Sequence, residues 1–339
     1  MKRIFIVAGL LMGLVLSVPS LSHASDDGSI QVERISGVNR YETAVEISKY
    51  TFRSSMTAII ATGENFPDAL AGGTLATQIK APILLTQKNN VPSTVINELK
   101  RLNVRTVYIL GGEAAVSRKV ENELSKLTKV RRIAGKDRYE TAHEIGSLRY
   151  DLRPNQEINA MGDGIVFVSG NNFPDALCAA PYIGQQGGDM LLYLLLLRPG
   201  EDAAPFPVIG GPGVIKNTAE FDREPHIEED GSLYEHRIYG KNRYGTAVEI
   251  AKRYPINVKK RIDTIILTNG LDYPDALSAA PLVGSLNGAL LLTNPQKISE
   301  ETKQYLKENN IERVIVVGGK NAVSGNVIQE IEQIERILK

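Results

Sequence analysis

Residues 34–44 of this chain read Arg-Ile-Ser-Gly-Val-Asn-Arg-Tyr-Glu-Thr-Ala, and nearly the same phrase returns twice. Residues 132–142 read Arg-Ile-Ala-Gly-Lys-Asp-Arg-Tyr-Glu-Thr-Ala, and residues 237–247 read Arg-Ile-Tyr-Gly-Lys-Asn-Arg-Tyr-Gly-Thr-Ala. The copies are about a hundred residues apart. A phrase repeated at a fixed period indicates a chain built from copies of one structural unit.

A second phrase follows each copy of the first. It reads Phe-Pro-Asp-Ala-Leu at 66–70 and 173–177, and Tyr-Pro-Asp-Ala-Leu at 273–277. Two motifs that recur three times in the same order predict a triplicated module. The three repeats are expected at residues 30–129, 130–233 and 234–339, with the middle one divergent.

Each copy alternates the patterns of strands and helices. Continuous aliphatic runs at 58–61, 165–168 and 264–267 are typical of strands buried on both faces of a parallel sheet. Asn39, with Glu42 three residues later, has the pattern of a capping box that begins a helix. The fold class predicted is therefore α/β, with each copy forming a small domain around a parallel sheet.

Glycines mark the expected turns. Gly37, Gly135 and Gly240 follow the first strand of each copy, where glycine permits a turn. A Gly-Gly pair follows a later strand in each copy, a position where parallel sheets can also bind nucleotides. Neither Gly-x-Gly-x-x-Gly after a strand nor Gly-Lys-[Ser/Thr] occurs, so tight turns are the better interpretation.

The middle copy departs from the plan of the other two. It lacks the helix expected at about 92–102 and 299–309 in the other copies, and residues 198–205 stand in its place. It also carries additional residues at 155–164 and 222–234.

The first 24 residues have the pattern of a secretory signal peptide. Lys2 and Arg3 precede an apolar run from Ile4 to Leu16, and a small-x-small cleavage signal ends at Ala24. The run is short for a membrane span, so the mature chain is expected outside the cell without a span. Its near-neutral charge offers no general attraction to nucleic acid.

Catalysis finds little support in the sequence. The histidines of the mature chain, His143, His226 and His236, occupy unrelated positions in the repeat and lack metal-ligand spacing. Cys178 is the only cysteine, and it fits a small packed residue better than a nucleophile. We therefore expect no catalytic residue, no metal and no cofactor.

The repeated phrases resemble the cell wall binding repeat type 2 family of surface and secreted proteins of Gram-positive bacteria. The residues that carry the resemblance are Arg-x-x-Gly-x-x-Arg-Tyr-x-Thr-Ala, [Phe/Tyr]-Pro-Asp-Ala-Leu, the Pro-Ile-Leu-Leu-Thr segment at 82–86 and the late Gly-Gly. The resemblance covers nearly the whole mature chain. It implies three Rossmann-like modules packed about a pseudo-threefold axis, and non-covalent attachment to an anionic cell wall glycopolymer.

The resemblance also implies candidate site residues. In clostridial surface proteins of this family an Ile-Leu-Leu strand is associated with anchoring. It maps to Ile83, Leu84 and Leu85 in the first copy and to Leu290, Leu291 and Leu292 in the third. In the middle copy residues 189–192, Asp-Met-Leu-Leu, are matched to that strand, which puts this copy's competence in doubt.

The repeated arginines are a second set of candidates. A guanidinium at a helix start suits a phosphate or carboxylate, so Arg40, Arg138 and Arg243 are candidate ligand contacts. The alternative is that each pairs with an aspartate of its own repeat, and this is the favoured interpretation. The aspartates concerned are Asp68, Asp175 and Asp275.

The function predicted is that of a non-catalytic, secreted cell wall binding protein. Three weak sites on one chain would raise retention on a repetitive polymer. Two alternatives stay open, a wall hydrolase or protein associated with an N-acetylmuramoyl-L-alanine amidase, and a structural component of a surface layer with surface-layer partners.

Overall fold

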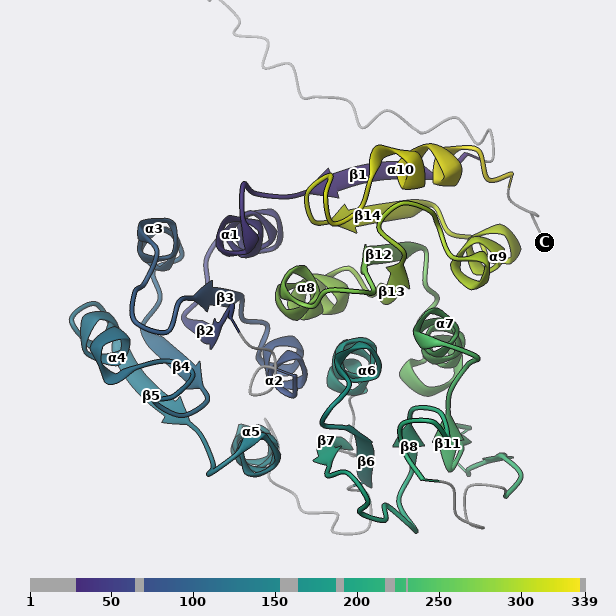
Figure 1. The fold of residues 1–339 in the computed structure, drawn as a ribbon, viewed down its shortest axis with the longest axis horizontal. Coiled ribbons are helices and arrows are strands. Elements are labelled where there is room, and N and C mark those ends of the chain that lie inside the picture. The colour runs from purple at the N-terminus through teal and green to yellow at the C-terminus, as the bar shows by residue number, and fades with distance from the viewer. Residues whose placement is uncertain are drawn as a thin grey trace, which may run out of the picture.

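The structure is a computed structural model, and it describes residues 29–64, 70–152, 164–186, 192–216, 223–229 and 231–335. The expected signal peptide, Asp68 and residues 187–191 lie outside the described residues. Three four-stranded parallel sheets surround three central helices, as Figure 1 shows. No helix in these ranges combines the length and the apolar character needed to cross a bilayer.

The first sheet has the strand order β3-β2-β4-β5. Its strands are β2 (Thr57–Thr62), β3 (Ile83–Thr86), β4 (Thr106–Leu110) and β5 (Lys129–Ile133). The helices between them are α2 (Gly72–Ile79), α3 (Ser93–Arg101) and α4 (Arg118–Ser125).

The second sheet has the order β11-β8-β6-β7. Its strands are β6 (Gly164–Ser169), β7 (Leu192–Leu197), β8 (Val208–Ile209) and β11 (Arg237–Ile238), with α6 (Phe173–Gln185) after β6. The described residues between β7 and β8 contain no helix, as expected for the middle copy. A small antiparallel pair, β9 (His226–Ile227) and β10 (Leu233–Tyr234), precedes β11.

The third sheet has the order β1-β14-β12-β13. Its strands are β1 (Gln31–Ile35), β12 (Thr264–Asn269), β13 (Ala289–Thr293) and β14 (Arg313–Val317). Its helices are α8 (Pro274–Ser285), α9 (Glu300–Glu308) and α10 (Gly325–Glu332).

The sheets do not coincide with the sequence repeats. β5 begins the second copy of the repeated phrase but completes the first sheet, and β11 of the third copy completes the second sheet. β1 closes the ring, because it pairs in parallel with β14 almost three hundred residues later (Figure 1). The expectation that each copy forms its own sheet is therefore corrected: each sheet takes its fourth strand from the copy that follows it around the ring.

Three helices lead from these fourth strands into the next module. They are α1 (Arg40–Thr51), α5 (Arg138–Asp151) and α7 (Arg243–Arg253), and α7 continues into a π-helical turn, η3 (Tyr254–Val258). The expected caps are present, because Asn39, Asp137 and Asn242 each accept two backbone amides. α1, α5 and α7 pack on the edge strands β3, β7 and β13 respectively, so these edges are covered.

The strands β2, β3, β12 and β13 are buried on both faces, which explains their continuous apolar sequences. In β2, Ile59 and Ala61 belong to a core shared by all three modules, whereas Ala58 and Ile60 belong to a separate outer core under α3 and α4. The shared core surrounds α2, α6 and α8, which pack on one another about the pseudo-threefold axis (Figure 1). The predicted architecture is confirmed.

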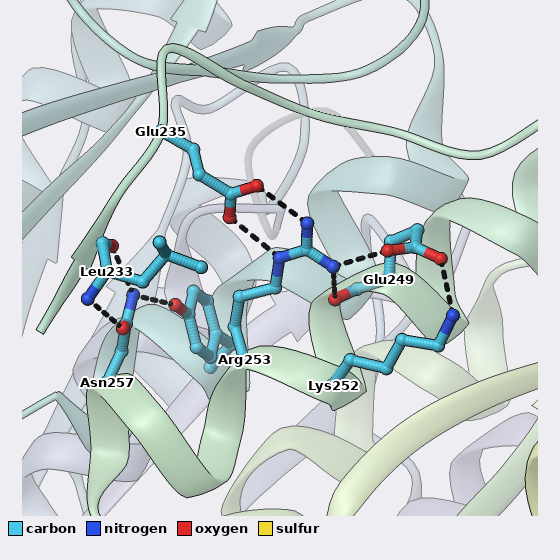
Figure 2. Close-up of polar contacts among 7 residues, drawn as sticks. Leu233, Glu235, Glu249, Lys252, Arg253 and Asn257 are labelled. Atoms are coloured by element: carbon cyan, nitrogen blue, oxygen red, sulfur yellow. Dashed lines mark hydrogen bonds and ion pairs between the residues drawn. The ribbon is translucent and has the colours of Figure 1, made fainter. Parts of the chain in front are cut away.

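The insertion before the third copy is fixed to the third module by polar contacts (Figure 2). Arg253 donates two hydrogen bonds of 2.7 Å to the carboxylate of Glu235, and it also pairs with Glu249. The side-chain amide of Asn257 bonds both backbone groups of Leu233, at 2.9 and 3.0 Å. These contacts hold the segment before β11 against α7 and η3.

Candidate functional site

A pocket of about 370 Å³ lies where the third sheet meets the start of α1. We call it the junction pocket, because its lining comes from the first and third copies. Its polar lining includes Asn39, Arg40, Thr43, Asp272, Asp275 and Lys320.

The strand ends determine where this pocket forms. Gly37 follows β1, Asp272 follows β12, and Gly319 follows β14, so all three lie beyond the carboxyl ends of neighbouring parallel strands. Open parallel sheets bind ligands at such an edge. The first turns of α1 and α8 also line the pocket, and a helix start favours an anion.

Arg40 fixes α1 to the next sheet. Its guanidinium donates a 2.5 Å hydrogen bond to the carbonyl of Gly63, directly after β2. Arg138 and Arg243 make the equivalent bonds to Gly170 and Gly270, at 2.8 and 2.7 Å. These three predicted site residues therefore hold each linking helix to a strand end, and a contact with a ligand remains a prediction.

Asp275 and Asp175 interact with side chains of a neighbouring copy. Asp275 accepts a hydrogen bond from Thr43 and feels the charge of Arg40, both in the first copy. Asp175 likewise accepts a hydrogen bond from Thr246 and interacts with the charge of Arg243, both in the third copy. For Asp175 and Asp275 the expected pairing within one repeat is therefore corrected to an interaction with the next copy around the ring, because the phrase that carries the arginine begins with the fourth strand of their own sheet. Asp68 lies outside the described residues.

Burial changes the acidity of both described aspartates. Removal from water raises the pKa of Asp175 to about 6, although the charge of Arg243 and the Thr246 hydroxyl oppose the shift. Burial likewise raises the pKa of Asp275, opposed by Thr43 and Arg40. The structural role of these aspartates stays a prediction.

The first arginine of each phrase bonds the late Gly-Gly turn. Arg34 donates to the carbonyl of Gly318, Arg132 to Gly111, and Arg237 to Gly210, at 2.5, 2.7 and 2.6 Å. These three glycines have φ of +114°, +97° and +137°, a region that favours glycine. The predicted tight turns are confirmed.

The earlier glycines have a different physical role from the one expected. Gly37, Gly135 and Gly240 do not have positive φ in the structure. A Cβ added to Gly37 would stand 2.3 Å from Cβ of Glu42, and Gly135 would meet Glu140 at 2.1 Å. Glycine is therefore required here because the chain passes against the first turn of the helix.

The predicted anchoring strands are buried. Ile83, Leu84 and Leu85 form β3 and are at most 2% exposed. Leu290, Leu291 and Leu292 in β13 are equally buried, and register places the two triplets at equivalent positions. A contribution of these residues to binding would act through the position of the strand, since their side chains are packed in the protein.

The middle copy keeps this strand, but at other residues than the 189–192 matched to it from the sequence. Pairing with β6 places Leu194, Leu195 and Leu196 at the positions of Ile83, Leu84 and Leu85. The amide of Gly170 bonds the carbonyl of Leu197, as Gly63 bonds Thr86. The match to residues 189–192 is therefore wrong, because the register with the central strand, rather than the first apolar letters, defines the equivalent residues.

The charge at the pocket rim differs between the three junctions. Lys320 follows the Gly-Gly turn in the junction pocket and is exposed. The equivalent residues are Glu113 after Gly112 and Pro212 after Gly211. Glu113 is paired with Arg118 at 2.5 Å. Lys320 was not predicted as a site residue, although the position of Lys320 after a repeated turn was a signal that could have identified it.

Two further features concern the cysteine and the potential metal ligands. Cys178 is buried, and burial raises the pKa of its thiol well above the usual value. Within the described ranges, no cluster of three or more His, Cys, Asp or Glu side chains is arranged to hold a metal ion.

Comparison with known families identifies the repeats. The model of the family described as "Cell wall binding domain 2 (CWB2)" matches residues 34–121, 132–220 and 237–328. The chain belongs to this cell wall binding family. The expected family, the class of cell wall binding protein and the location at the cell wall are confirmed by this match.

Two curated proteins of Bacillus subtilis (strain 168) match most of the chain. The N-acetylmuramoyl-L-alanine amidase LytC is 30% identical over 332 residues, which cover 95% of this chain and 61% of the amidase. An amidase enhancer is 28% identical over 314 residues, which cover 92% of this chain and 42% of the enhancer. The chain thus spans less than two thirds of each relative.

Solved structures support the fold. Cwp6 from Clostridium difficile has a TM-score of 0.73 at 23% identity, over 91% of this chain and 48% of that one. Cwp8 from the same organism has a TM-score of 0.71 at 24% identity, over 91% of this chain and 52% of that one.

Proposed function

We propose that this protein retains itself on the Gram-positive cell wall by binding an anionic wall glycopolymer at the junction pocket, without a catalytic step of its own. The observation that carries the proposal is the pocket at the carboxyl ends of β1, β12 and β14, with Arg40 and Lys320 in its lining. Its volume of about 370 Å³ suits a short segment of a polymer.

The chemistry of the lining supports a ligand that is both anionic and rich in hydroxyl groups. A guanidinium, an ammonium and the start of α1 favour a phosphate or carboxylate. Asn39 and Asp272 add polar groups that can bond to sugar hydroxyls. Arg40 and Lys320 supply local positive groups beside the carboxylates of Asp272 and Asp275, whereas the chain as a whole is nearly neutral.

In this proposal, the three junctions contribute unequally to binding of the anionic polymer. Lys320 at one rim, the paired Glu113 at the second and Pro212 at the third give different local charges. The junction of the third and first copies is therefore the main anion site. Weaker contacts at the other junctions would add to retention through high effective concentration.

Lys320 is the better residue to mutate, because loss of Arg40 would also remove the hydrogen bond that holds α1 to Gly63. Lys320→Ala should lower retention of the protein on purified walls several-fold, and the loss should shrink at high salt. Lys303→Ala removes the same charge from the exposed face of α9 and is the matched control. Equal retention of both variants, or equal retention on walls stripped of anionic polymer, would contradict the proposal.

The proposal that the chain is non-catalytic has its own test. The match covers 61% of the amidase relative, so it gives no support for the activity of that whole protein in this chain. Purified protein should produce no clearing in a gel that contains peptidoglycan. Clearing by the wild-type protein would overturn this part.

A further inference from the structure

A second pocket, of about 250 Å³, lies at the carboxyl ends of β6 and β7 in the middle module. We call it the middle pocket. Its polar lining is Ser169, Asn171, Asn172 and Arg198, and its apolar lining includes Leu197, Pro199 and Val214. Its volume is below the range of about 300–1,000 Å³ that holds drug-sized ligands, so it suits a single small unit.

The divergence of the middle copy accounts for this space. In the first copy, the amide of Ser117 bonds the carbonyl of Lys88, which ties the loop after β3 to the start of α4. Ser324 bonds Pro295 in the same way in the third copy. In the middle copy, Leu197 replaces the threonine that ends the edge strand. Among the described backbone contacts, the loop that begins at Arg198 makes no equivalent hydrogen bond to the segment after the Gly-Gly turn. The pocket lies beside this opened loop.

Uncharged polar groups face the middle pocket. Asn172 stands before α6 but makes no capping hydrogen bond with its side chain. The equivalent residue in the junction pocket is Asp272. Asn171, which lines the pocket, accepts a 3.3 Å hydrogen bond from the hydroxyl of Tyr139 through its carboxamide oxygen. Carboxamides both donate and accept, which matches hydroxyl and acetamido groups.

Arg198 forms a wall of the middle pocket without giving it a net positive charge. Its guanidinium lies 4.2 Å from the ring centroid of Tyr139. It pairs with Asp137 at 2.8 Å and with Glu201 at 3.4 Å. Two carboxylates thus neutralise one guanidinium, and an anion gains little by entering.

We propose that the middle pocket binds one uncharged sugar unit of the wall, so that the middle module recognises a neutral part of the glycan. This inference rests on the proposed wall-binding function. Asn171 and Asn172 bond the hydroxyl or acetamido groups, and Pro199 and Val214 contact the apolar face of the ring. The middle copy is then a site of different specificity rather than a degenerate one.

Ligand-observed NMR titrations of the wild-type chain test this proposal, with N-acetylglucosamine, glucose and inorganic phosphate as separate probes. One of the two sugars should bind, with an affinity that does not change between low and high salt. A response to N-acetylglucosamine indicates an acetamido sugar, and a response to glucose alone indicates a plain hexose. Either response supports the proposal if it depends on the middle pocket.

That dependence is measured with Asn172→Ala, which should weaken sugar binding by about tenfold. Asn326→Ala, on the exposed face of α10, is the matched control and should change nothing. The missing capping bond means that Asn172→Ala should keep the fold, which circular dichroism checks. Equal affinity of the two variants, no response to either sugar, or competition by phosphate would overturn the proposal.

Failure of this inference is separable from failure of the proposed function. Wild-type protein that is retained on walls but shows no Asn172-dependent sugar response refutes only the middle pocket. Protein that binds the sugar but is not retained on walls refutes the proposed function instead.

Discussion

Gly73 and Ala180 meet across the pseudo-threefold axis so closely that a Cβ on Gly73 would stand 2.9 Å from the methyl group of Ala180. The same added atom would stand 2.9 Å from the methyl group of Ala280. These three residues occupy equivalent positions in α2, α6 and α8. The axis therefore accommodates two alanines and one glycine in this layer.

Gly73→Ala should lower the free energy of unfolding by about 1–3 kcal/mol, since neither methyl group can rotate away from the new one. Alanine's better helix propensity returns at most about 1 kcal/mol. Urea denaturation measures the change. The double variant Gly73→Ala with Ala280→Gly restores one glycine to the layer and should recover much of the loss. A double variant less stable than Gly73→Ala would contradict this packing.

Arg34→Ala should lower the local stability of the C-terminal strand β14 and the turn after it. Arg34 donates to the carbonyls of Gly318 and Val323, and its loss leaves both acceptors without this partner at a cost of about 1–3 kcal/mol. Hydrogen exchange should then accelerate in β14 and leave β4 unchanged.

Arg132→Ala is the control for that experiment, because Arg132 makes the equivalent bond to Gly111 in the first sheet. It should accelerate exchange in β4 rather than in β14. If Arg34→Ala changed exchange only in the N-terminal module, the ring closure by β1 would be refuted.

Leu85→Ala should destabilise the protein by about 2–5 kcal/mol, because Leu85 is fully buried in the shared core. Wall retention of the folded fraction should not change if this strand acts only as scaffold. The two readouts are unfolding by urea and retention at a temperature where the variant is folded. Loss of wall retention by the folded variant would instead support a role of this strand in anchoring.

Stability should depend on the ionisation of Asp175. Its pKa of about 6 in the folded protein exceeds the ordinary value of 3.8, so the folded state binds more protons between these values. Stability contributed by the protonated form is present below about pH 4 and is lost as the pH rises through about 6. Asp175→Asn should therefore stabilise the protein by roughly 1–3 kcal/mol at pH 7.5 and by much less at pH 4.5.

Urea denaturation at these two pH values checks the prediction, with Asp272→Asn as a control because Asp272 is exposed. A stabilisation by Asp175→Asn that is equal at both pH values would show that ionisation is not its cause.

Much of the fold could be predicted from the sequence, because its signals are local. Aliphatic runs such as Ile59 to Ala61 indicate strands buried on both faces, and Asn39 with Glu42 indicates a helix start. The triplicated phrases identified the family and the threefold architecture. The positive φ of Gly111 and its counterparts likewise agrees with the turns predicted at Gly-Gly.

The site was less predictable, because it depends on which copies become neighbours. The sequence places Arg40 and Asp275 more than two hundred residues apart, and only closure of the ring by β1 brings the charge of Arg40 to bear on Asp275. The strand of the middle copy was misaligned for a related reason, since register with β6 defines it.

The repeat, the local elements and the family follow from the amino-acid sequence, because each depends on residues that are close together in the chain. The tertiary structure alone decided that β1 completes the last sheet and that the arginines bond strand-end carbonyls. It also decided which side chains line each of the two pockets. Hydrogen bonding between parallel strands is satisfied only by a neighbouring strand, and any copy can provide that strand, so its identity is settled by packing around the axis.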